Sequence, residues 1–246
     1  MGFTYLMCGS WNTQGVIGKV PRFFMPAHEN PKSQIKSRQR VADHGEVFTN
    51  PREVNAMLDL VRDESFRLDS RFLEPACGDG NFLIEILRRK LSLLQDIKSP
   101  TDWKFQSIIA VGSCYGIDIL PDNAEACRTR REHYVLSQHP TLERLSVDSH
   151  YLLSLRYMLR KNIVCGDALS YRTAEDKPIV FCEWTPIAGS MQFSRRDFQF
   201  DFLVTQSHQY SLFDEQGEVQ SFDEPIKVFP PVHYTQIHAY DTITHY

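Results

Sequence analysis

Four segments of the chain carry apolar residues at the spacing of one helix face. In the first, Asn50 and Pro51 suit a helix cap and a first helical position, and Glu53 lies three residues after the cap. The apolar stripe that follows consists of Val54, Met57, Leu58 and Val61. Further helices are predicted over residues 82–94, 121–138 and 142–160, and the basic residues 88–90 are expected on a solvated face.

Short apolar runs between these helices predict strands. Three runs each end near an acidic residue: the first near Glu74, the second near Asp118 and the third near Asp167. A further strand is predicted over residues 177–182. Because strands alternate with helices, we expect an α/β fold with a mostly parallel sheet and helices on both faces. We expect residues 1–40 to form an irregular basic extension, residues 41–210 the main domain, and residues 211–246 a mostly irregular C-terminal extension.

A tight turn with two glycines follows the first of these strands and precedes a helix. Its sequence is Glu74-Pro75-Ala76-Cys77-Gly78-Asp79-Gly80. Glycine permits positive φ and close approach of the backbone to a ligand, and a helix N-terminus offers free N–H groups. The turn is therefore predicted to let a small molecule lie against the main chain.

The acidic residues at the predicted strand ends indicate what that molecule is. In open α/β sheets, ligands bind beyond the carboxyl ends of the strands, so Asp118 is placed to accept hydrogen bonds from ribose hydroxyls. The turn lacks the Gly-x-Gly-x-x-Gly pattern, which favours a nucleoside cofactor without a pyrophosphate. Taken singly, Asp118 could instead cap a helix and Asp167 could hold a turn.

Together these segments resemble S-adenosylmethionine-dependent DNA methyltransferases that act on adenine N6 in restriction–modification systems. The resemblance covers roughly residues 38–184 and rests on four segments in the family's usual order. These segments are residues 44–51, 74–82, 116–118 and 166–169. The resemblance implies a Rossmann-like class I methyltransferase sheet and S-adenosyl-L-methionine as the cofactor.

The resemblance also implies a role for each segment. Residues 44–51 would contact the methionine end of the cofactor, Asp118 would bind its ribose, and Asp167 would accept from the amino group of its adenine. The cofactor-binding residues that it implies are Glu46, Phe48, Thr49, Glu74, Pro75, Ala76, Cys77, Gly78, Gly80, Asp118, Ile119, Asp167 and Ala168.

The catalytic motif of that family, Asn/Asp-Pro-Pro-Tyr/Phe, does not occur in this chain. Two segments could replace it. In the preferred one, residues 181–186, Glu183 would accept from the target amine and Trp184 would stack on the flipped base, although a packing role for Trp184 is equally open. The other is residues 200–204, predicted as a strand that runs into residues 205–209.

Charge and composition bear on partners and location. Residues 1–44 carry six Lys or Arg and two acidic residues, so they hold +4 of a net charge of −4 and the remainder holds −8. The basic run 32–40 could contact a nucleic acid backbone, but we favour a solvated tail. Six scattered cysteines without a Cys-x-x-Cys pair argue against a metal site and suit the cytoplasm, and no apolar run is long enough to span a membrane.

The resemblance implies a DNA (adenine-N6) methyltransferase that acts on duplex DNA. Only about 60 residues follow Trp184, which leaves little room for a recognition domain, so a separate DNA-specificity or restriction subunit is a candidate partner. The missing motif also motivates an alternative, a catalytically degenerate homologue that binds the cofactor and acts as a partner or regulator. A methyltransferase for RNA or protein is a third hypothesis, because a fold alone does not determine the substrate.

Overall fold

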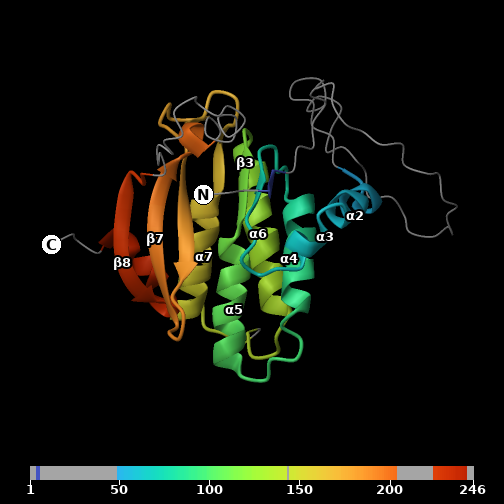
Figure 1. Ribbon diagram of the computed structural model, residues 1–246, viewed down its shortest axis with the longest axis vertical. Helices are drawn as coiled ribbons and strands as arrows, with labels where there is room; N and C mark the ends of the chain where they lie inside the picture. Colours follow the sequence, from blue (N-terminus) through green and yellow to red (C-terminus); the bar gives the residue numbers. More distant parts are fainter. Residues whose placement is uncertain (1–3, 6–48, 143, 204–223, 243–246) are drawn as a thin grey trace, which may run out of the picture.

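The protein is described here by a computed structural model that covers residues 4–5, 49–142, 144–203 and 224–242. Within these residues the chain forms an α/β structure with two sheets and a group of helices beside them (Figure 1). Glu46 and Phe48, residues 205–209 and most of the basic extension lie outside the described residues.

The first sheet is mixed and mostly parallel, as the sequence predicts. Its order is β1 (Thr4–Tyr5), β2 (Phe72–Glu74), β3 (Cys114–Asp118), β4 (Ile163–Asp167) and β5 (Arg172–Thr173). The first four strands pair in parallel, and β5 pairs with β4 in antiparallel orientation. β1 lies within the extension that we predicted to be irregular, and its two residues pair with the start of β2.

Six helices are described, and their bounds are α2 (Pro51–Asp59), α3 (Arg62–Ser65), α4 (Asn81–Ser92), α5 (Pro100–Gly112), α6 (Pro121–Ser137) and α7 (His150–Asn162). The predicted start of α2 is confirmed, because the Asn50 side chain accepts a hydrogen bond from Arg52 N–H at 2.9 Å. α5 was not predicted, although Ser99 caps it and Pro100 occupies its first position. α7 begins eight residues later than predicted, because Ser149 caps it by accepting from Leu152 N–H.

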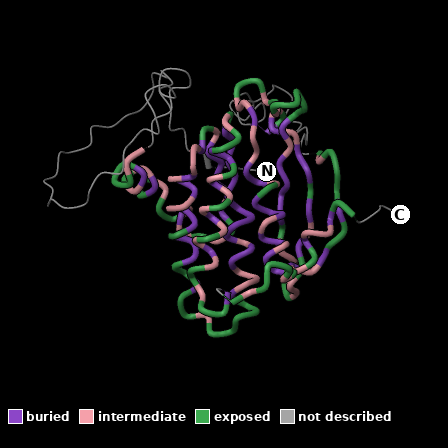
Figure 2. Tube along the Cα trace, turned by 180° about the vertical axis from the view of Figure 1, so that it is seen from behind, coloured by how far each residue is buried: buried purple, intermediate pink, exposed green. Residues whose placement is uncertain are grey.

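The two faces of the first sheet have different partners. On one face, Phe72, Cys114 and Ile163 pack in a buried cluster with side chains of α2, α4 and α6. On the other face, Leu73 and Tyr115 lie in a cluster whose described members come from the strands and the segments that flank them, with none from α2–α7. This differs from the expected helices on both faces, because a second sheet covers the second face. Figure 2 shows that the buried part of the molecule lies along the central strands and the inner sides of the helices.

The second sheet is antiparallel and has the order β6 (Val180–Pro186), β7 (Gln192–Gln199), β8 (Lys227–His233). β8 leads into the 3-10 helix η1 (Tyr234–Thr242), whose buried residues Ile237 and Tyr240 pack with α7 and β8. The prediction that residues 211–246 are mostly irregular is therefore corrected for residues 227–242. The adjacent prolines 230 and 231 are exposed residues of β8, which is an edge strand of this sheet, where proline is tolerated.

β6 runs in the direction opposite to β2, β3 and β4. Ile179, the residue before β6, lies against Gly166 at the carboxyl end of β4. A Cβ added to Gly166 would lie only 2.9 Å from the Ile179 side chain. Near its end, Trp184 Nε1 donates to Asn162 Oδ1 at 2.8 Å, and Asn162 directly precedes β4. The strand predicted over residues 177–182 therefore exists, but it starts three residues later and ends four residues later than predicted, at the amino-end side of the first sheet.

Two further local predictions differ from the structure. Residues 200–203 form a helical turn instead of a strand. Arg89 and Lys90 are buried instead of solvated, because α4 packs against both the sheet and α5. The Lys90 ammonium donates to Leu68 O at 3.0 Å, and to Ser70 O and Ser113 Oγ at 2.5 and 2.7 Å.

Candidate functional site

The parallel strands of the first sheet bring three acidic residues to one edge. β2 ends at Glu74, β3 at Asp118 and β4 at Asp167, and in the pairing Glu74 opposes Gly116 while Asp118 opposes Cys165. We call this side of the sheet, with residues 74–80, 118–119 and 167–169, the carboxyl edge. It is the edge at which ligands bind in open α/β sheets.

The glycine turn is fixed by its own backbone and by β3. Cys77 N–H donates to Ile117 O at 2.9 Å, and Gly80 N–H donates to Cys77 O at 2.9 Å. Gly78 and Gly80 have φ of 53° and 95°, which is the left-handed region that other residues rarely adopt. Gly80 also precedes α4 directly and offers no side chain to cap it. The first turn of α4 therefore presents main-chain N–H groups at the carboxyl edge.

Asp118 joins the glycine turn to the end of β3. Its Oδ2 accepts from Gly78 N–H at 2.8 Å, while its Oδ1 accepts from Leu120 N–H at 2.9 Å and from Asn123 Nδ2 at 3.2 Å. The side chain is 8% exposed. The helix-capping interpretation and the ligand-binding interpretation are thus compatible, because a carboxylate has about four acceptor positions and three are used by described donors.

Glu74 and Cys77 are buried residues that stabilise the turn. Glu74 is buried, and its Oε1 accepts from Ala76 N–H at 3.3 Å. Cys77 is buried and packs against Gly116. A Cβ added to Gly116 would lie only 2.9 Å from the Cys77 Sγ. Ala76 is exposed, and Pro75, Gly78 and Asp79 are half-buried. Of these predicted cofactor residues, Glu74 and Cys77 therefore shape the turn instead of lining an open surface.

The end of β4 adds a carboxylate and apolar surface. Asp167 is half-buried, and its Oδ1 accepts from Leu169 N–H at 2.9 Å. This backbone hydrogen bond lowers the pKa of Asp167 below its ordinary value, because it stabilises the carboxylate form. Ala168 packs beside the cluster that contains Tyr115. Ile119 and Leu169 are 56% and 64% exposed, which gives the edge two accessible apolar side chains next to its acids.

The predicted segment for the methionine end of the cofactor is described only from Thr49 onward. Thr49 is half-buried and lies immediately before the cap of α2. Glu46 and Phe48 fall outside the described residues, so their assignment stays a prediction.

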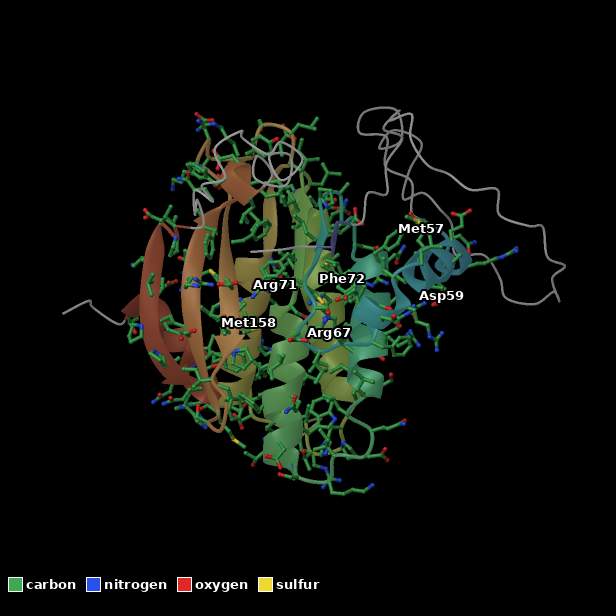
Figure 3. All side chains as sticks on the ribbon, viewed as in Figure 1. Met57, Asp59, Arg67, Arg71, Phe72 and Met158 are labelled. Carbon is green, nitrogen blue, oxygen red and sulfur yellow. The ribbon has the colours of Figure 1, made fainter. Side chains whose placement is uncertain are left out.

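The structure does not bring Glu183 to the carboxyl edge. Glu183 is 2% exposed, and its Oε1 pairs with Arg71 at 2.7 Å while its Oε2 accepts from Arg196 Nε at 2.6 Å. Arg71 precedes β2, and Figure 3 labels it beside Phe72, at the start of that strand. Glu183 therefore joins the amino-end side of the first sheet to β7 of the second. We interpret it as a structural residue instead of an acceptor for a target amine.

Trp184 lies on the same remote side and on the opposite face of β6. It is 6% exposed, and besides its hydrogen bond to Asn162 it packs on Tyr240, with 6.0 Å between ring centroids. Its Cβ approaches Gly112 at the end of α5. A flipped base could not stack on a ring enclosed in this way, so the packing interpretation that the sequence left open is the one that the geometry favours.

The second candidate segment lies nearer the carboxyl edge. β7 runs antiparallel to β6, so its last residue lies on the side where β6 begins. Phe200, which follows β7, packs on Tyr171 with 5.4 Å between ring centroids, and Tyr171 lies four residues after Asp167. Phe202 in the same helical turn is 57% exposed. Among the described residues that follow β7, Phe202 is therefore an accessible aromatic side chain, whereas Trp184 is enclosed on the other side.

Two residues of α6 take part in the site without having been predicted. Asn123 holds Asp118, and Arg130 holds both Asp79 and Asn81 on either side of Gly80. The position of Asn123, two residues after the helix-starting Pro121, is a possible signal in the sequence for a role at the helix start. Nothing in the sequence signals Arg130, because its contacts are set by how α6 packs beside α4.

Within the described residues, no group of three or more His, Cys, Asp or Glu side chains is arranged to hold a metal ion. None of the helices in the described part of the chain combines the length and the apolar character needed to cross a membrane.

The chain matches no family model, no curated protein and no solved structure. The functional conclusion therefore rests on the resemblance in the four sequence segments and on the arrangement of the carboxyl edge.

Proposed function

We propose that the carboxyl edge binds S-adenosyl-L-methionine and that the protein is a DNA methyltransferase for adenine N6 in duplex DNA, acting within a restriction–modification system. The observation that carries the proposal is the hydrogen bond from Gly78 N–H to Asp118 Oδ2, which joins the glycine turn to the acidic end of the neighbouring strand. The parallel strands, the two positive φ angles and the helix after the turn fit a Rossmann-like methyltransferase sheet.

The residues present fit the parts of this cofactor. Asp118 has acceptor capacity beside the turn for ribose hydroxyls, and Asp167 offers a carboxylate, oriented by Leu169 N–H, as an acceptor for the adenine amino group. Ile119 and Leu169 offer apolar surface to the adenine ring. The N-terminus of α4, beyond Gly80, is suited to the carboxylate of the methionine part, because main-chain N–H groups and the helix dipole favour an anion.

When bound, the cofactor supplies an activated methyl group on a sulfonium centre. The protein's own contribution is to position that group against the exocyclic nitrogen of a flipped adenine and to orient the amine. Because Glu183 and Trp184 lie at the other side of the sheet, we assign the base-facing position to the segment after β7, with Phe202 as the accessible aromatic side chain. The acidic balance of residues 45–246 agrees with a separate DNA-specificity or restriction subunit that supplies phosphate contacts.

One observation favours a second candidate function. The carboxyl edge keeps the features of a cofactor site, whereas both preferred catalytic residues are used for packing and ion pairing. The second candidate is therefore a homologue that binds the cofactor without methyl transfer and acts as a partner or regulator.

Binding and turnover of the full chain test the two candidates together. Calorimetric titration with S-adenosyl-L-homocysteine is expected to show binding, and Asp118→Ala is expected to weaken it at least tenfold, because a charged acceptor is worth about 1.5–3 kcal/mol. The matched control is Asp63→Ala, which removes an exposed carboxylate from α3. Equal affinity of the wild type and Asp118→Ala would refute the assignment of that residue.

Transfer of labelled methyl to unmodified DNA separates the candidates. Label recovered as N6-methyladenine supports the enzyme. Cofactor binding without transfer, both for the chain alone and with its partner subunit, supports the second candidate. No binding to the folded wild type would overturn both.

A further inference from the structure

Arg130 of α6 is bound to the residues on both sides of Gly80. Its Nη1 lies 2.6 Å from Asp79 Oδ1 and donates to Asp79 O at 2.8 Å. Its Nη1 and Nη2 both donate to Asn81 Oδ1, at 3.2 and 3.1 Å. One guanidinium therefore holds the side chains immediately before and after the glycine that begins α4.

Asp79 and Asn81 are the side chains that could otherwise occupy the N-terminus of α4. Asp and Asn are among the strongest helix-capping residues, and a carboxylate is attracted to the positive end of the helix dipole. Gly80 has no side chain for this purpose, and the first turn of α4 contains no acidic residue. Asp79 is thus the nearest carboxylate along the chain that could compete for the free N–H groups of that turn.

Resting on the proposed function, we propose that Arg130 is a positioning residue that keeps the N-terminus of α4 available for the carboxylate of S-adenosyl-L-methionine. It does so by neutralising Asp79 and by holding Asp79 and Asn81 toward α6. We assign the guanidinium no direct contact with the cofactor carboxylate, because Asp79 and Asn81 engage both of its terminal nitrogens.

If Arg130 has this role, its substitution weakens the binding of ligands that carry a carboxylate more than the binding of ligands that lack one. Arg130→Met frees the Asp79 carboxylate, which then competes with and repels the carboxylate of S-adenosyl-L-homocysteine. The affinity for this ligand is expected to fall about tenfold, the size of one helix-terminus charge interaction. 5′-Methylthioadenosine has the same adenosine and thioether but no carboxylate, so its affinity is expected to change less than about threefold.

A second substitution identifies the competing group. In Asp79→Ala/Arg130→Met, residue 79 has neither a negative charge nor an oxygen that could cap α4, and the affinity for S-adenosyl-L-homocysteine is expected to return to within about threefold of the wild type. If Arg130 bound the cofactor carboxylate directly, the second substitution could not restore the affinity. A double variant that binds S-adenosyl-L-homocysteine as weakly as Arg130→Met would therefore overturn the proposal.

The matched control is Arg156→Met, which removes another arginine paired with a carboxylate, Glu132 of α6, away from the turn. It is expected to leave both affinities unchanged. If Arg130→Met does not fold, Arg130→Gln serves instead, because its uncharged amide keeps a polar side chain but cannot neutralise Asp79, and it should lower the affinity for S-adenosyl-L-homocysteine alone.

The outcomes also separate this proposal from the proposed function. Equal losses for both ligands in Arg130→Met would indicate a general structural role and overturn the positioning role. Unchanged affinity for both ligands would overturn it as well. A folded wild type that binds neither ligand would overturn the proposed function itself, before any variant is considered.

Discussion

At the scale of single residues, the environment of a side chain decides between interpretations that the sequence leaves equal. Trp184 follows the strand predicted over residues 177–182, and this sequence position is compatible with base stacking or with packing. Its indole N–H donates to Asn162 Oδ1, and its ring lies between Tyr157 and Tyr240. A buried indole with a satisfied N–H is a feature of a core.

Trp184→Phe tests this interpretation. The substitution removes the hydrogen bond and part of the ring while keeping an aromatic side chain, so the free energy of unfolding is expected to fall by about 1–3 kcal/mol. The affinity for S-adenosyl-L-homocysteine is expected to stay the same. Urea unfolding and calorimetry measure the two quantities. A variant with wild-type stability that has lost methyl transfer would instead favour a catalytic role.

At the scale of elements, α4 shows how a helix can bury charge that its sequence places on a polar face. Lys90 follows Arg88 and Arg89 in a basic run, yet its ammonium is enclosed by acceptors from residues 68–70 and from Ser113. Burial lowers the pKa of Lys90 to about 8, from 10.5 for an ordinary lysine.

This lowered pKa predicts a pH dependence of stability. Between pH 8 and 10.5 the unfolded chain binds more protons at this lysine than the folded chain does, so its contribution to stability rises with pH. The free energy of unfolding of the wild type minus that of Lys90→Met is expected to increase by about 2 kcal/mol from pH 7.5 to 10. Urea unfolding at several pH values measures this difference. Parallel curves for the two proteins would show that Lys90 titrates normally in the fold.

The sequence predicted the helices and strands whose starts or ends are marked by residues at the boundary itself. Asn50-Pro51 and Pro121 mark the starts of α2 and α6, and the acids Asp118 and Asp167 end β3 and β4 as expected. The direction of β6 could not be predicted, because an apolar run does not encode the strand beside which it will lie. β8 and η1 were missed for the same reason, since they depend on pairing with β7 and packing on α7, both distant in the sequence.

At the scale of the whole molecule, the reversed direction of β6 places the predicted cofactor residues and the predicted catalytic residues at opposite sides. The turn, Asp118 and Asp167 lie where β2, β3 and β4 end. Glu183 lies where β2 begins, and there it connects the two sheets. The site and the junction between the sheets are therefore separate parts of the fold.

Glu183→Gln tests this separation. Glu183 is buried between Arg71 and Arg196, whose own side chains are partly exposed, so loss of its charge is expected to lower the free energy of unfolding by about 1–3 kcal/mol, less than for a fully buried pair. Glu132→Gln, which breaks an ion pair between two helices, is the matched control and is expected to cost less than 1 kcal/mol. Because the junction lies away from the carboxyl edge, the affinity of Glu183→Gln for S-adenosyl-L-homocysteine should equal that of the wild type. A stable Glu183→Gln protein that binds the cofactor but no longer transfers methyl would instead make Glu183 part of the catalytic machinery.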